Sequence, residues 1–266
     1  MLIAGGLCAA LGYSGLCLAV SHWQTRLALF PVVGLDRTPT DVGLNFEEWI
    51  LPSGSGQVVA WKISPRHGQV KHWLLHCHGN GGNIAGRLEL AQALTEQGIG
   101  VVLFDYRGYG RSQGQIQAEA DLFQDGQAVY NRMAELKQPV WIYGESLGGG
   151  VASYLAETNA CAGLALQSTF TRFTDRAGEA YPFLPVRWLS RFQLNTQDRL
   201  ARLHCPVLVM HGSKDEVIGF HHGQRLFAAA HQPKTWVELD RGHNDPSLEL
   251  IATSVRKWME AASAES

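Results

Sequence analysis

Short apolar segments alternate with amphipathic segments along most of this 266-residue chain, and this alternation restricts its fold more than any other feature. Several apolar segments lack interspersed polar residues, as is typical of parallel strands covered on both faces. The amphipathic segments repeat apolar residues at helical spacing, and Asn83 is the expected N-cap of one of them. We therefore predict an α/β fold with a mostly parallel central sheet and helices on both faces. The expected strands are residues 44–51, 57–63, 73–79, 99–106, 139–144, 162–168, 206–212 and 235–240.

In open α/β sheets, functional sites form beyond the carboxyl ends of the strands, which limits the candidate residues. Ser146 lies in the sequence GESLGG, between the expected strand at 139–144 and a helix-like segment. Gly144 and Gly148 flank it at positions −2 and +2, where side chains would clash in a sharp strand-to-helix turn. This context predicts that Ser146 is a nucleophile. The alternative is a glycine turn with a bystander serine.

A serine nucleophile needs a base, and the base needs an acid that orients it. His243 follows the expected strand at 235–240 and is the predicted base. Asp215 follows the strand at 206–212 and is the predicted acid, with the adjacent Glu216 as the fallback. Other histidines are expected to bond to backbone in turns (His78, His211) or to lie on the surface (His221, His222).

The oxyanion formed during acyl transfer needs two backbone N–H donors. We expect these from Leu147, the residue after the nucleophile, and from Asn80 in the glycine-rich sequence HGNGGN. A phosphate-binding loop is less consistent with HGNGGN, because the pattern G-x-x-x-x-G-K-[ST] is missing. In the loop FDYRGYGRS, Asp105 and Arg107 are expected to pair and to brace the site.

Residues 169–204 lie between two expected core strands and are predicted to form a short cap over the site. The cap is aromatic, and Phe170, Phe173 and Tyr181 are the candidate substrate-binding residues. An aromatic cap suits an acyl chain, although ordinary packing of the cap onto the sheet explains the aromatic residues equally well. The excess of arginine over acidic residues in this segment fits either an anionic membrane surface or a solvated face.

Residues 2–20 contain no charged residue, and a helix of this length would rise about 28 Å, enough to cross the hydrocarbon core of a membrane. We predict a membrane-anchor helix over residues 1–25, acting as a single-pass signal anchor, and a hydrolase domain over residues 26–266. Alternatives are a cleaved signal peptide, which would give a secreted or periplasmic protein, and a buried helix. The orientation in the membrane is open.

Composition bears on the possible partners. The net charge is −2 and no Lys/Arg tract occurs, so no nucleic-acid partner is expected. The five cysteines form no C-x-x-C pair, and we expect no metal and no organic cofactor.

The sequences HGNGGN, FDYRGYGRS, GESLGGG, PVLVMHGSKDEV and GHND together resemble the α/β-hydrolase superfamily, more narrowly its Bem46-type branch, over roughly residues 26–260. The chain order Ser146, Asp215, His243 is also the order in that superfamily. The resemblance implies the α/β-hydrolase fold, with these three residues as nucleophile, acid and base. One departure is Ile218–Gly219, where the branch more usually has Val-Pro. This departure questions the shape of the loop after the acid.

The resulting hypothesis is a serine hydrolase that cleaves carboxylic ester or thioester bonds in a small molecule, a lipid or an acylated protein. A serine peptidase or amidase would use the same three residues, so the sequence does not exclude it. A third possibility is a non-catalytic, membrane-anchored binding protein on a hydrolase scaffold. The intact set of Ser146, Asp215 and His243 argues against it.

Overall fold

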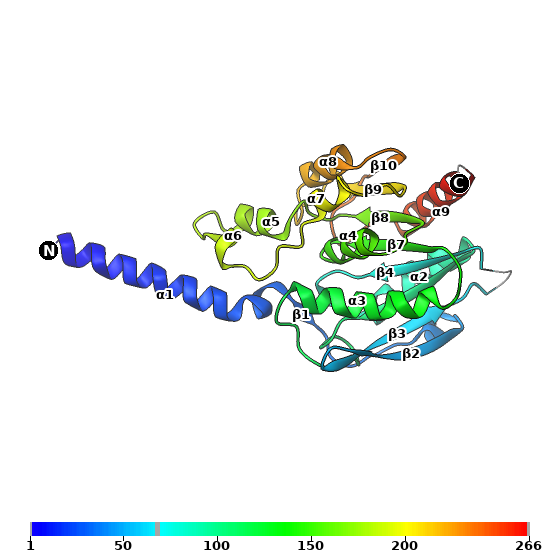
Figure 1. Ribbon diagram of the computed structural model, residues 1–266, viewed down its shortest axis with the longest axis horizontal. Coiled ribbons are helices and arrows are strands. Elements are labelled where there is room, and N and C mark those ends of the chain that lie inside the picture. The colour runs from blue at the N-terminus through cyan, green and yellow to red at the C-terminus, as the bar shows by residue number, and fades with distance from the viewer. Residues whose placement is uncertain (1, 67–69, 265–266) are drawn as a thin grey trace.

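The central sheet has eight strands in the order β10-β9-β8-β7-β4-β6-β3-β2 (Figure 1). The structure is a computed structural model that describes residues 2–66 and 70–264. Strands β2 and β3 are antiparallel and lie at one edge, whereas the other strands are parallel to one another. The strands are β2 (Phe46–Ser53), β3 (Gly56–Ile63), β4 (His72–Cys77), β6 (Ile99–Asp105), β7 (Val140–Glu145), β8 (Gly163–Gln167), β9 (Val207–Gly212) and β10 (Lys234–Leu239).

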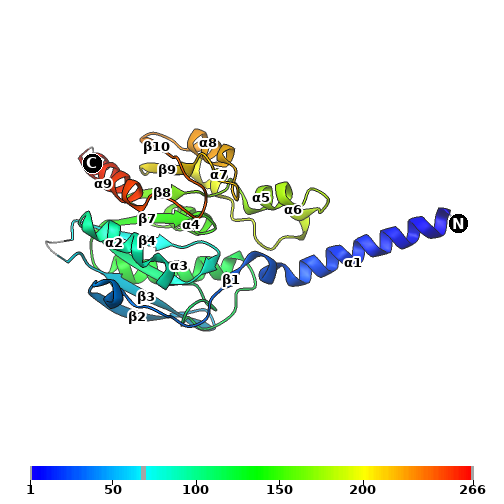
Figure 2. The same cartoon turned by 180° about the vertical axis from the view of Figure 1, so that it is seen from behind.

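Helices cover both faces of this sheet (Figures 1 and 2). Each face has its own apolar core: Val129 of α3 and Leu155 of α4 pack into one, Leu94 of α2 and Val255 of α9 into the other. The predicted α/β-hydrolase architecture is therefore confirmed. The first face carries α3 (Glu119–Ala134), α4 (Gly148–Thr158), α7 (Thr196–Leu200) and α8 (Phe220–Ala229), and the second carries the 3-10 turn Ile84–Arg87, α2 (Leu88–Glu96) and α9 (Leu248–Ala264).

Strand register brings the candidate residues to one edge of the sheet. Gly144 of β7 lies opposite Cys77 of β4 and Leu166 of β8, so the loops that follow these strands meet. Leu239 of β10 likewise lies opposite Gly212 of β9. The segments after β4, β7, β9 and β10 therefore emerge at the same edge of the sheet.

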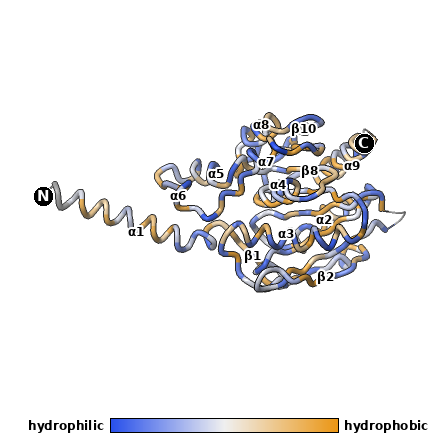
Figure 3. Tube along the Cα trace, in the orientation of Figure 1, coloured by the Kyte–Doolittle hydropathy of each residue, from blue (hydrophilic) through white to orange (hydrophobic). Residues whose placement is uncertain are grey.

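Helix α1 (Leu2–Ala28) projects from the domain as a single long rod (Figure 1). It continues past residue 25, the predicted boundary of the hydrolase domain, and Met1 lies outside the described residues. Its hydrophilic residues are concentrated at the inner end, next to the domain (Figure 3). Directly after α1, the short strand β1 (Phe30–Pro31) pairs in parallel with β5 (Gly81–Gly82) inside HGNGGN. The inner end of α1 is thus tied to one of the candidate site loops.

The segment between β8 and β9 carries three short helices, two of which point away from the sheet beside α1 (Figures 1 and 2). These two are α5 (Phe173–Ala180) and α6 (Val186–Leu189), and we refer to residues 169–204 as the cap. The third helix, α7, packs back against α4 and α8. The division of the chain into an anchor, a hydrolase domain and a cap stays a prediction, because α1 and the cap contact each other.

Candidate active site

Ser146 occupies the sharp turn between β7 and α4, with a backbone φ of +52°. This left-handed conformation is uncommon for a residue other than glycine, and it fits the strained turn that exposes a nucleophile. A Cβ atom at Gly148 would lie 2.0 Å from the carbonyl oxygen of Cys77. A Cβ atom at Gly144 would lie 2.6 Å from the Cα of Gly149. The two flanking glycines are therefore required by close backbone approach, as the sequence pattern suggested.

The structure brings Ser146, His243 and Asp215 into one hydrogen-bonded chain. His243 Nδ1 lies 2.7 Å from Asp215 Oδ2, and His243 Nε2 lies 3.1 Å from Ser146 Oγ. When Nδ1 donates to the carboxylate, Nε2 is free to accept the serine proton. All three side chains are largely shielded from water, since Ser146 and Asp215 are each 7% exposed and the His243 side chain 12%. The arrangement is competent for nucleophilic catalysis.

Asp215 is held by its own loop. Its Oδ1 accepts hydrogen bonds from the backbone N–H groups of Val217 at 2.9 Å and Ile218 at 2.7 Å. Burial alone would raise the pKa of Asp215, but the hydrogen bonds from His243 and Ile218 outweigh it and lower the pKa. The carboxylate therefore stays ionised beside the imidazole. The unusual residue Ile218 fits this loop, and its carbonyl oxygen lies 2.8 Å from Nε2 of His211. The adjacent Glu216 is exposed.

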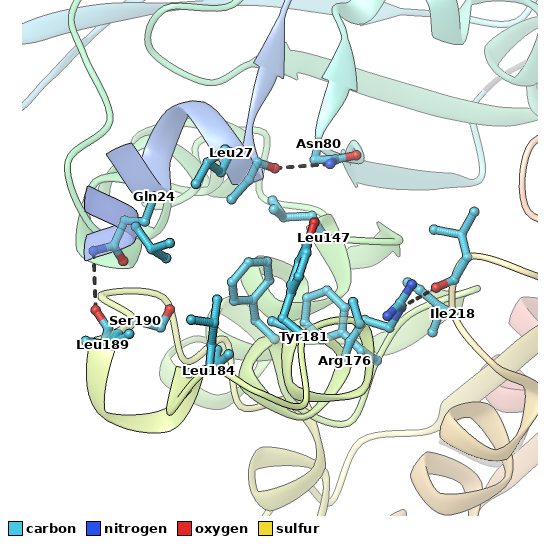
Figure 4. A pocket seen from close by; sticks show the side chains of 18 of the residues that line it. Gln24, Leu27, Asn80, Leu147, Arg176, Tyr181, Leu184, Leu189, Ser190 and Ile218 are labelled. Atoms are coloured by element: carbon cyan, nitrogen blue, oxygen red, sulfur yellow. Dashed lines mark hydrogen bonds between the residues drawn. The ribbon is translucent and has the colours of Figure 1, made fainter. Parts of the chain in front are cut away.

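Leu147 and Asn80, the two expected oxyanion donors, both line the cavity that contains Ser146. Leu147 is the N-cap of α4, where backbone N–H groups have no partner within the helix. Asn80 is fixed on its other sides: its carbonyl oxygen accepts from Phe30 N at 2.9 Å and from Tyr109 Oη at 2.8 Å. Its side-chain Nδ2 donates to the carbonyl of Ala28 at 3.1 Å (Figure 4). These contacts hold the residue rigidly without using its N–H.

A cavity of about 380 Å³ lies above Ser146, within the size range of small-molecule sites. The three aromatic residues expected to contact substrate, Phe170, Phe173 and Tyr181, all line it. The sequence did not reveal the opposite wall, which is the inner end of α1 (Figure 4). That wall consists of Val20, Gln24, Leu27 and Ala28.

Glu145, directly before Ser146, had no role that the sequence could suggest. In the structure its carboxylate accepts two hydrogen bonds from the guanidinium of Arg87, both at 3.1 Å, and lies 3.4 Å from His76 Nε2. Burial by itself would raise the pKa of Glu145, but His76 and Arg87 lower it to about 2. Arg87 follows the HGNGGN loop, so this ion pair joins the segment after the loop of Asn80 to the end of β7, directly before Ser146.

The expected pair between Asp105 and Arg107 does not form. Asp105 Oδ1 instead accepts from the backbone N–H of Ile84 at 2.9 Å, after the HGNGGN loop. Arg107 pairs with the buried Asp125 and with Asp121, both in α3. Asp105 is the last residue of β6, whereas Arg107 lies in the loop after this strand, where its guanidinium reaches the carboxylates of α3. Asp105 thus supports the segment after the HGNGGN loop, whereas Arg107 connects its own loop to α3.

His222 is fully buried, contrary to the surface position that we expected, whereas His221 is exposed. Their Nε2 atoms lie 3.1 Å and 3.0 Å from the carboxylate of Glu179 in α5, and these three residues are of the types that bind metal ions. However, the backbone N–H of Thr171 points at Nδ1 of His222 at 3.2 Å, which leaves the proton on Nε2. Nε2 therefore donates to Glu179, and this hydrogen bond connects the cap to α8.

Residues 68–194 match the family described as Hydrolase_4, serine aminopeptidase, S33. The α/β-hydrolase domain-containing protein WAV2 of Arabidopsis thaliana is 30% identical over 265 residues, which cover 88% of this chain and 85% of that protein. Lysophosphatidylserine lipase ABHD12 of Danio rerio is 29% identical over 241 residues, which cover 75% of this chain and 63% of that protein.

Solved structures give the same fold. An esterase of Pyrococcus furiosus, Pf2001, superposes with a TM-score of 0.70 over 88% of this chain and 97% of its own. The two sequences are 15% identical, so this likeness concerns the arrangement of the strands and helices alone.

Proposed function

Because the chain belongs to the α/β-hydrolase superfamily and is a hydrolase of the serine type, we propose that it cleaves carboxylic ester or thioester bonds through Ser146, His243 and Asp215. One observation carries the proposal: Ser146 Oγ lies 3.1 Å from His243 Nε2 at the floor of an apolar cavity. The finer assignment to the Bem46-type branch stays a prediction. The alternative of a non-catalytic binding protein is dropped, because the chain is an enzyme.

Acylation uses the chain of hydrogen bonds already present. Ser146 Oγ attacks the acyl carbonyl carbon while His243 Nε2 takes its proton, and Asp215 stabilises the imidazolium that forms. The carbonyl oxygen becomes an oxyanion, which the N–H groups of Leu147 and Asn80 stabilise. When the tetrahedral intermediate collapses, His243 returns the proton to the leaving alcohol or thiol. The acyl group remains on Ser146 as an ester.

Deacylation repeats these steps with water. His243 removes a proton from a water molecule, the hydroxide attacks the acyl-enzyme, and the same two N–H groups hold the second oxyanion. Collapse breaks the bond between Ser146 Oγ and the acyl carbon, and His243 returns the proton to the serine. The products are a carboxylic acid and free enzyme.

An apolar acyl group suits the cavity best. Its lining is dominated by aliphatic and aromatic side chains from the cap and α1, and Arg176 is the one charged side chain among its described lining residues. The name of the relative ABHD12, a lysophosphatidylserine lipase, supports a lipid substrate for this chain as well. A small apolar ester or the acyl chain of a protein would meet the same lining.

A serine peptidase or amidase is the second candidate, because the matching family is described as a serine aminopeptidase. An aminopeptidase has to bind the positively charged amino terminus of its substrate, for which a carboxylate is the usual partner. The described lining residues of the cavity include no carboxylate. We therefore favour the ester, and the ratio of rates on an acyl ester and an aminoacyl amide separates the two candidates.

We also propose that α1 anchors the enzyme in a membrane. Residues Gly5–Ala28 are long and apolar enough to cross a bilayer, and residues 5–16 of this stretch are all exposed. The alternative, release of the protein by cleavage after the small-residue sequence Ala19-Val20-Ser21, would remove Val20 from the cavity wall. The intact mass of the membrane-bound protein distinguishes the two.

The direct test of the reaction is hydrolysis of p-nitrophenyl esters and acyl thioesters of increasing chain length by the wild type and by Ser146→Ala. We expect activity that depends on chain length in the wild type and none above background in the variant. Retained turnover in Ser146→Ala would refute the assignment of the nucleophile.

A further inference from the structure

We propose that α1 is a wall of the acyl-binding cavity as well as an anchor, and that the acyl chain of a bilayer lipid reaches Ser146 by passing between α1 and the cap. This inference rests on the proposed function and adds a source and a route for the substrate. The matching family segment, residues 68–194, does not include α1.

The inner half of α1 is joined to the cap across the cavity. Gln24 is 8% exposed; its Nε2 donates to the carbonyl of Leu189 at 3.3 Å, and its Oε1 accepts from the backbone N–H of Arg191 at 2.6 Å (Figure 4). Val20 and Leu27 line the cavity one turn to either side of Gln24, and Leu27 lies across the cavity from Leu184 and Tyr181 of the cap (Figure 4). The cavity is therefore incomplete without the helix.

The described residues leave the outer half of α1 uncovered. All residues from Gly5 to Leu16 are exposed, and Leu7 and Leu11 are 61% and 64% exposed. An uninterrupted apolar surface of this kind is characteristic of a contact with lipid or with another protein.

The cap continues this apolar surface. Tyr13 Oη donates a hydrogen bond to the carbonyl of Phe183 at 2.8 Å, which places the tip of the cap beside the exposed half of α1. The side chains at the tip are exposed and aromatic: Tyr181 at 53%, Phe183 at 61% and Trp188 at 90%. Tyrosine and tryptophan are enriched where a protein meets the membrane surface.

Contact with a lipid bilayer accounts for both exposed apolar surfaces, namely the outer half of α1 and the tip of the cap. The same helix that carries the exposed leucines is long and apolar enough to enter a membrane. Since Tyr13 lies within this apolar stretch and contacts Phe183, inserting α1 brings the tip of the cap to the lipid surface. The cavity between α1 and the cap then faces the acyl-chain region of the bilayer. A lipid acyl chain can therefore enter the cavity without passing through water.

The position of α1 also bears on the reacting carbonyl. The carbonyl of Ala28, the last residue of α1, accepts a hydrogen bond from Asn80 Nδ2, and the backbone of Phe30 donates to Asn80. An acyl chain bound along Val20 would therefore end beside Asn80, a residue that α1 itself holds in place. This connection makes α1 a positioning element for the oxyanion donor.

Two substitutions on opposite faces of α1 test the wall. Val20→Trp fills the cavity, whereas Leu18→Trp adds the same ring at an outward-facing residue that is 72% exposed and does not line the cavity. With full-length protein in lipid nanodiscs, we expect Val20→Trp to lower the ratio of kcat/KM for p-nitrophenyl dodecanoate over acetate at least tenfold. Leu18→Trp should leave the ratio within twofold of the wild type.

A second substitution at position 20, to the smaller alanine, gives an independent test of the same wall. Val20→Ala adds no bulk and should raise KM for the dodecanoate more than it lowers kcat. Equal ratios in Val20→Trp, Leu18→Trp and the wild type, with Ser146→Ala inactive, would overturn the wall while leaving the proposed function intact. Activity retained in Ser146→Ala would instead refute the proposed function.

The proposed route of the acyl chain from the bilayer is tested by a separate measurement, the quenching of tryptophan fluorescence. Lipids brominated along the acyl chain quench tryptophan that reaches the membrane, so we expect wild-type fluorescence to lose more intensity than that of Trp188→Phe. The difference isolates Trp188 from the other exposed tryptophan, Trp23. Equal fractional quenching in the two proteins would show that the cap tip stays away from the lipid and would overturn the route.

Discussion

His243 Nδ1 and Asp215 Oδ2 are 2.7 Å apart, although 28 residues separate them in the chain. The hydrogen bond fixes the imidazole so that its other nitrogen faces Ser146, and the two backbone N–H groups on Asp215 Oδ1 hold the carboxylate in turn. The proposed chemistry depends on this relationship.

Replacing Asp215 with asparagine should lower kcat by about 10⁴-fold, the size of effect found when an amide in this position favours the wrong imidazole tautomer. The fold should survive, because the amide oxygen can still accept from the backbone. The control is Glu216→Gln at the exposed neighbour, which should retain wild-type activity. Loss of activity in Glu216→Gln together with an active Asp215→Asn would transfer the acid role to Glu216.

Gly148 has no space for a side chain, because a Cβ atom would lie 2.0 Å from the carbonyl of Cys77. Gly148→Ala should cost about 1–3 kcal/mol of unfolding free energy and disturb the turn of Ser146. Gly178, inside α5, has no atom within 4 Å of the position that an alanine methyl group would take, so Gly178→Ala should stabilise the protein by about 0.5–1 kcal/mol. Urea denaturation measures both. Equal effects of the two substitutions would contradict the steric argument.

Glu145 should make stability depend on pH. Its folded-state pKa of about 2 lies below the ordinary value of 4.5, so its contribution is complete above about pH 4.5 and is lost as the pH falls towards 2. Glu145→Gln leaves Arg87 without its charged partner and should lower the unfolding free energy at pH 7 by about 2–3 kcal/mol.

The same variant should lose less stability than the wild type between pH 4.5 and 2, as measured by denaturation at both ends of that range. Glu135→Gln is the control, since that side chain is 61% exposed and surface ion pairs contribute less than about 1 kcal/mol. If both variants followed the wild-type pH dependence, the ion pair between Glu145 and Arg87 would not stabilise the fold.

The sequence alone was sufficient to predict the features that depend on residues close together in the chain. Strand positions follow from short apolar segments, and the strand-end rule then selects Ser146, Asp215 and His243, because parallel strands end at one edge. Gly144 and Gly148 could be interpreted for the same reason: the turn geometry that they permit is local.

Features that depend on contacts between distant segments were missed. Gln24 reaches Leu189 across 165 residues, so no local pattern shows that α1 lines the cavity. Glu145 has no partner nearby in sequence, since Arg87 lies 58 residues away. The predicted pairing of Asp105 with Arg107 is wrong because proximity in sequence does not ensure proximity in space, and α3 supplies closer carboxylates to Arg107. The cap buries His222, although the composition of the surrounding sequence suggested a surface position.

The covalent step of the proposed mechanism is tested most directly by intact-protein mass spectrometry during turnover of a slowly hydrolysed long-chain p-nitrophenyl ester. We predict that the wild type gains the mass of one acyl group, located on the peptide that contains Ser146, and that Ser146→Ala gains none while remaining folded. An unmodified wild type that still hydrolyses the ester, or an acyl group on any other residue, would contradict the mechanism.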